Sequence, residues 1–149
     1  VGGASEPLYE PGRKEARVYF REDYAASALH EIAHWCIAGA DRRRETDYGY
    51  WYRGERDVKQ QRTFEAVEVK PQALEWIFSV AAGIDFRVSS DNFDESTLDI
   101  SGFRAKVHAA VIIWLNGLPP SAERFIHALV AQTGNQQALT SDTYREPPK

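Results

Sequence analysis

The chain carries His-Glu-Ile-Ala-His at positions 30–34, and these residue types at this spacing can hold a metal ion. On a helix, positions i and i+4 share a face, so His30 and His34 point to the same side about one turn apart. Two imidazoles placed in this way can bind one divalent metal. Glu31 lies about 100° around the helix from His30, and can reach a water on the metal without being a ligand. We therefore predict a metal site formed by His30 and His34, with Glu31 as a catalytic residue.

The residues around this motif predict the helix that must carry it. Ile32, Ala33 and Trp35 are uncharged, as a buried metal-bearing helix requires. Asp23 is suited to cap the helix at its N-terminus, and Gly39 is suited to follow its last turn. We expect a helix from about residue 23 to residue 38.

Apolar spacing and turn residues predict the remaining elements. Further helices are expected at 64–82, 101–116 and 121–133, with Pro71 either kinking the first or delaying its start to about Lys70. Short strands are expected at 16–20, 48–52 and 86–88.

The predicted fold is α+β: one helix-rich domain over residues 1–149, with a small β-sheet and a metallopeptidase-like HExxH helix. Residues 1–15 and 135–149 are expected to be irregular arms. Since the 149 residues include no methionine, we expect an N-terminal part to be missing.

Composition narrows the class of protein. The net charge of −4 argues against a general nucleic-acid binder, which needs a basic face. No apolar run approaches the ~20 residues that span a bilayer, so no membrane partner is expected. Cys36 is the only cysteine, which excludes an internal disulfide and favours a reduced, cytoplasmic location.

A catalytic metal usually has a third protein ligand. Glu68 is the leading candidate, because it follows on the next predicted helix between Val67 and Val69. A buried carboxylate is costly unless it is paired or binds a metal. Glu65 is the alternative, and Glu75 is disfavoured because it lies two turns further along. Gln72, one turn after Glu68, is a candidate partner that orients a ligand.

Two histidines and one carboxylate leave the chemistry open. With Zn²⁺ they support hydrolysis, Glu31 acting as the general base of a metallopeptidase. With Fe²⁺ they form a facial triad that supports oxygenation with O₂. A third possibility is a binding module in which the metal is structural, although an open coordination position argues against it.

Longer runs around these residues resemble the bacterial elongation factor P hydroxylase family. The runs are 24–39, 48–52 and 64–76, with shorter similarity at 80–83 and 124–126. The resemblance implies a peptidase-like fold used for hydroxylation of the modified lysine of elongation factor P, in translation. It implies metal ligands at His30, His34 and Glu68, with O₂ as co-substrate. It implies iron more than zinc as the working metal, while Zn²⁺ or another divalent metal could occupy the site in a crystal. No motif for 2-oxoglutarate or a flavin is present, so the sequence assigns no electron donor.

A modified lysine has an apolar stem and cationic amines, and one segment offers groups of matching chemistry. Tyr48, Tyr50 and Trp51 could form an aromatic wall, with the Asp47 carboxylate beside it. We expect these four residues to bind the substrate, although ordinary packing of a strand is the alternative.

Overall fold

The structure, a computed structural model, describes residues 1–22, 24–46, 58–89 and 100–148, without the side chains of 58–62, 64 and 65. Two short strands, β1 (Leu8–Glu10) and β2 (Arg17–Tyr19), precede helix α1 (Ala25–Ile37) and the 3₁₀ turn η1 (Arg42–Arg44). The chain continues with α2 (Val58–Ala82), α3 (Ile100–Leu115) and α4 (Pro120–Thr133). Two further 3₁₀ turns follow, η2 (Gln136–Leu139) and η3 (Ser141–Tyr144). The predicted α+β class, rich in helix with a small sheet, is confirmed.

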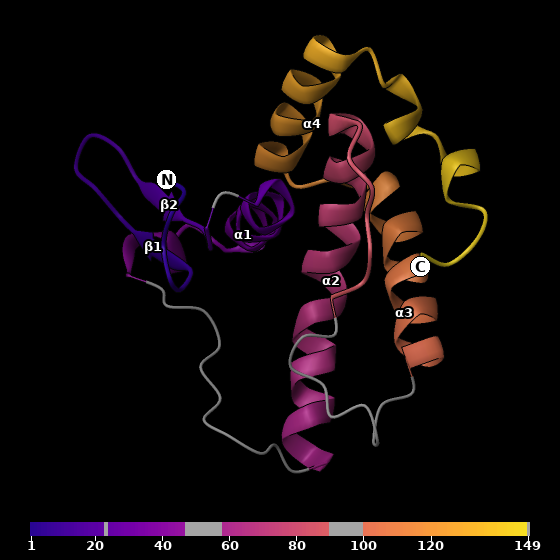
Figure 1. The fold of residues 1–149 in the computed structure, drawn as a ribbon, viewed down its shortest axis with the longest axis horizontal. Helices are drawn as coiled ribbons and strands as arrows, with labels where there is room; N and C mark the ends of the chain where they lie inside the picture. The colour runs from indigo at the N-terminus through magenta and orange to yellow at the C-terminus, as the bar shows by residue number, and fades with distance from the viewer. Residues whose placement is uncertain (23, 47–57, 90–99, 149) are drawn as a thin grey trace.

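Helix α2 is the centre of the molecule, because α1, α3 and α4 all pack against it (Figure 1). Its buried apolar residues meet buried side chains of the other three helices in one core; the α2 members are Ala73, Leu74, Ile77, Phe78 and Ala81. Full burial of a side chain of the size of Leu74 or Phe78 stabilises the fold by roughly 1.5–3 kcal/mol. The position of α2 is therefore fixed on three sides.

The small sheet is an antiparallel hairpin beside α1. Leu8 pairs with Tyr19, and Glu10 pairs with Arg17. The prediction of a strand at 16–20 is confirmed by β2, whereas the prediction of an irregular arm at 1–15 is wrong at β1. The missing signal was the pairing itself, because three residues become a strand only when a partner strand receives their hydrogen bonds.

The predicted helices are confirmed, with one difference of length. α1, α3 and α4 match the expected ranges closely, but Asp23 lies outside the described residues and Tyr24 holds the N-cap position without a side-chain cap. α2 begins at Val58 and continues through Pro71. Packing against three helices holds α2 together despite the hydrogen bond that proline cannot form.

The expected strand at 86–88 is wrong. Residues 84–89 instead run as an irregular strap alongside α2, visible as the pink coil beside that helix in Figure 1. Phe86 stacks on Trp76 of α2, with ring centroids 5.7 Å apart. At the end of the strap, the backbone of Ser89 is hydrogen-bonded to a side chain of α2. The strap is thus held by side chains of a helix rather than by a neighbouring strand.

The chain after α4 is also more ordered than the expected irregular arm. Tyr144 is buried, its hydroxyl donates to the carbonyl of Ala138 over 2.8 Å, and its ring meets Trp76 edge-on. His108 of α3 donates to the carbonyl of Tyr144. The C-terminal segment therefore closes the core against α2 and α3. Among the described residues, no helix is both long and apolar enough to cross a membrane.

Arg43 secures the C-terminal end of α1. Its guanidinium donates to the carbonyls of Trp35 and Cys36 over 2.9 and 3.0 Å and to the Ser121 hydroxyl of α4 over 3.1 Å. It also lies 3.9 Å from the centroid of the Trp35 ring. These contacts satisfy carbonyls that the helix end leaves without partners and connect α1 to α4.

We predict that Arg43→Lys lowers the free energy of unfolding by about 1–3 kcal/mol, because an ammonium cannot make this set of hydrogen bonds at once. The matched control is Arg44→Lys. Arg44 is 79% exposed and makes a 3.7 Å ion pair with Asp41, so its replacement should change stability by less than about 0.5 kcal/mol. Chemical denaturation measures both variants, and equal stabilities would contradict the role of Arg43.

Candidate metal centre

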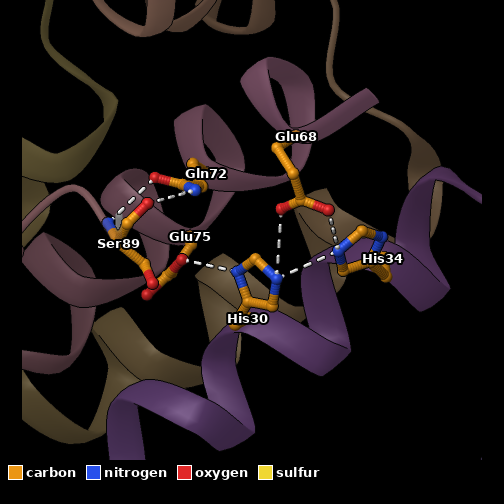
Figure 2. Close-up of polar contacts among 6 residues, drawn as sticks. All are labelled: His30, His34, Glu68, Gln72, Glu75 and Ser89. Atoms are coloured by element: carbon orange, nitrogen blue, oxygen red, sulfur yellow. Dashed lines mark hydrogen bonds and ion pairs between the residues drawn. The ribbon is translucent and has the colours of Figure 1, made fainter. Parts of the chain in front are cut away.

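His30 and His34 of α1 meet Glu68 of α2 across the interface of the two helices (Figure 2). One ligand atom from each residue can be chosen so that all lie within 4.8 Å of one another. The two Nε2 atoms are 3.0 Å apart, and each imidazole has a carboxylate oxygen of Glu68 at 3.4 Å from its Nε2. The structure therefore brings together the three residues that the sequence predicted as ligands.

The donor set fits a divalent cation. Two imidazole nitrogens and a carboxylate converge, and two unprotonated nitrogens 3.0 Å apart repel each other unless a proton or a cation lies between them. Ligand atoms ~2.1 Å from a shared ion stand ~3.0 to ~3.4 Å apart for octahedral to tetrahedral angles. The three observed separations of 3.0, 3.4 and 3.4 Å match that range.

Local sequence explains how the helices present these groups. In α1, Leu29, Ala33 and Cys36 are buried at helical spacing, and each histidine follows one of the first two. The core face of α1 thus turns His30 and His34 towards α2. In α2, the buried polar residues recur every three or four positions along one face: Glu68, Gln72, Glu75 and Ser79.

Glu75 has a place in the site that sequence reasoning missed. His30 Nδ1–H donates to a Glu75 carboxylate oxygen over 2.8 Å, whereas the Nε2 of the same ring faces Glu68. Two helical turns separate Glu68 from Glu75, which is why the sequence disfavoured Glu75 as a ligand of the same ion. The His30 imidazole nevertheless contacts both carboxylates, one with each ring nitrogen. The missed signal was the seven-residue spacing, which places both acids on one face of the helix.

The carboxylates control the protonation of His30. Burial lowers the pKa of His30. The hydrogen bond from its ring to Glu75 and the charges of the three nearby glutamates, Glu75, Glu68 and Glu31, outweigh this effect and raise the pKa to about 9. Burial raises the pKa of Glu68, yet the imidazoles of His34 and His30 and the Gln72 amide outweigh it, so that pKa is lowered. At neutral pH the metal-free site thus combines a protonated imidazole with an ionised carboxylate.

Glu31 is the remaining acid of the motif and is half-buried on α1. Burial raises the pKa of Glu31, while the neighbouring charges of His30 and His34 act in the opposite direction. Glu31 is thus easier to protonate than an exposed glutamate. A carboxyl group of this kind can hold or release a proton beside the two imidazoles.

Gln72 is 2% exposed and holds the strap next to the site. Its amide donates to the Ser89 carbonyl over 3.2 Å and accepts from the Ser89 N–H over 3.1 Å (Figure 2). These two bonds satisfy the backbone of Ser89 as a strand partner would. Gln72 therefore fixes residue 89 against the face of α2 that carries Glu68 and Glu75, in addition to its influence on Glu68.

The predicted substrate-binding residues Asp47, Tyr48, Tyr50 and Trp51 lie outside the described residues. The side chain of Glu65, the alternative third ligand, does too.

A helix-rich chain that brings two histidines of an HExxH helix to a glutamate of a following helix has an HExxH-type site. The model of the elongation factor P hydroxylase family matches residues 1–144. The chain belongs to this family, and the resemblance predicted from the sequence is confirmed. The elongation factor P lysine hydroxylase of Haemophilus influenzae (strain ATCC 51907 / DSM 11121 / KW20 / Rd) is 46% identical over 136 residues, which cover 88% of this chain and 76% of the relative.

The raised pKa of His30 predicts how pH affects the stability of the metal-free protein. Because this pKa is about 9 in the folded state against 6.5 for an ordinary histidine, protonation of His30 stabilises the fold fully below pH 6.5. The stabilisation is lost as the pH rises through 9. We expect the free energy of unfolding, measured by urea denaturation in a chelator, to fall across this interval.

The control for this pH dependence is His30→Gln, which keeps a polar side chain but cannot bind the proton. The fall in stability should be clearly smaller in this variant. A wild-type stability that stays constant or rises over the interval would contradict the assignment, and so would an equal slope in the two proteins.

Proposed function

We propose that this protein is a non-haem iron monooxygenase that hydroxylates the modified lysine of elongation factor P in the cytoplasm. The observation that carries the proposal is the convergence of His30, His34 and Glu68 in a chain of the elongation factor P hydroxylase family. The name of the Haemophilus influenzae relative, elongation factor P lysine hydroxylase, supports the same reaction and the same substrate protein.

The proposed ligands are His30, His34 and Glu68. Iron bound by two histidines and one carboxylate keeps open positions and supplies oxygenation chemistry with O₂. The site holds these side chains on two packed helices, so their positions are set before substrate binds. An external reductant must supply electrons, because one atom of O₂ enters the substrate and the other leaves as water.

Other residues of the chain are proposed to handle protons and substrate. Glu31, with its raised pKa, is placed to deliver a proton at the site. Tyr48, Tyr50 and Trp51 are proposed to enclose the apolar stem of the lysine, and Asp47 to bind an amine. Gln72 is proposed to keep Glu68 and the strap in register.

The test is turnover with intact-mass detection. Protein prepared under nitrogen is loaded with Fe²⁺ or Zn²⁺ and given elongation factor P carrying its modified lysine, O₂ and a reductant. We expect a gain of one oxygen atom with Fe²⁺ only, reduced at least about 100-fold in Glu68→Ala because the triad loses its carboxylate.

The matched control for Glu68→Ala is Glu123→Ala, which removes an exposed acid from the first turn of α4 and should leave turnover unchanged. Absence of any oxygen gain in the iron-loaded wild-type protein would refute the proposed reaction.

The zinc metallopeptidase is the second candidate, because its motif and the raised pKa of Glu31 also suit a general base. Glu31→Gln separates the two. If the protein is a hydroxylase, we expect Glu31→Gln to retain metal binding and to slow oxygen transfer about 100-fold. Neither the wild type nor this variant should then cleave peptides. Cleavage of a peptide library by the zinc-loaded wild type, abolished in Glu31→Gln, would instead establish the peptidase.

A further inference from the structure

Glu75 is a buried acid that belongs neither to the proposed metal ligands nor to the proposed substrate-binding residues. It is 6% exposed, although an ionised carboxylate is costly to remove from water. Its carboxylate oxygen lies 2.8 Å from His30 Nδ1 and compensates for that cost with a charge-assisted hydrogen bond.

The position of Glu75 prevents it from being a ligand of the same ion. It lies about 10 Å further along α2 than Glu68, at a rise of ~1.5 Å per residue. The His30 ring stands between the two carboxylates, with Nδ1 at Glu75 and Nε2 at Glu68 (Figure 2). The direct hydrogen-bond contact of Glu75 with the proposed ligands is therefore through His30.

The contact selects one state of the imidazole. When Nδ1–H is held by Glu75, the neutral ring keeps its lone pair on Nε2, which is the atom that faces Glu68 and His34. The negative charge beside Nδ1 also makes Nε2 a stronger electron-pair donor. His34, one turn further along α1, places its Nε2 3.0 Å from the Nε2 of His30.

We propose that Glu75 is a positioning residue, which fixes the orientation of His30 and keeps the proton on Nδ1, so that the proton displaced by a divalent cation is the one on Nε2. This inference rests on the proposed metal site, but not on the reaction performed there. A purely structural Glu75 would only connect α1 to α2, and would affect the stability of the fold without affecting metal affinity.

The experiment is a titration of metal-free protein with Co²⁺, followed by its ligand-field absorption, and with Zn²⁺ in competition with a chelator. Glu75→Gln preserves size but removes the charge and the strict preference for Nδ1–H. We expect it to weaken the binding of both metals about 10- to 100-fold. Glu75→Asp should also bind both metals more weakly than wild type. Its side chain is one methylene shorter, so its carboxylate cannot reach His30 Nδ1 to make the 2.8 Å hydrogen bond seen with Glu75.

The matched control is Ser79→Ala, a buried polar position one turn further along the same face of α2. It should bind both metals within about two-fold of wild type. Thermal unfolding of each metal-free variant reports the stability of the fold separately from metal affinity.

Weaker metal binding in Glu75→Gln, with wild-type affinity in Ser79→Ala, supports the proposal even if the protein hydroxylates nothing. Affinity within two-fold of wild type in Glu75→Gln overturns it, whatever happens to the thermal stability. A wild-type protein that binds neither metal overturns the site and this inference together, whereas failure of turnover alone affects only the proposed reaction.

Discussion

Two buried carboxylates of α2 meet two half-buried imidazoles of α1, and this interface constrains the rest of the structure. Charged groups that leave water need partners at hydrogen-bond distance, and a shift of one helix by a fraction of a turn would leave them unpaired. The relative register of α1 and α2 must therefore be held firmly by the surrounding elements. A divalent cation would satisfy the same groups that a proton on His30 satisfies in its absence.

The supports of this interface come from distant parts of the chain. α3 and α4 pack on the other sides of α2, and Arg43 joins the end of α1 to Ser121 of α4. Gln72 and Trp76 hold the strap against α2. A candidate metal site built on packed helices would need little reorganisation to bind an ion, because neighbouring elements already hold its side chains.

Elements with a strong local pattern were predicted well. α3 and α4 follow from apolar periodicity, and α1 follows from the uncharged residues around its histidines, because helical hydrogen bonds are local. Segments whose structure depends on a distant partner were predicted poorly. Residues 84–89 lie along a helix instead of forming a strand, and the segment ending in Tyr144 is ordered by Trp76 and His108.

The same division applies to the site. The amino-acid sequence alone determined the pairing of His30 with His34, since one turn of helix sets it, and it indicated Glu68 through its apolar neighbours. It could not assign Glu75, because spacing along one helix does not reveal which nitrogen of an imidazole on another helix it will meet. Only the packing of α1 across α2 decided that His30 lies between Glu68 and Glu75, with one ring nitrogen for each.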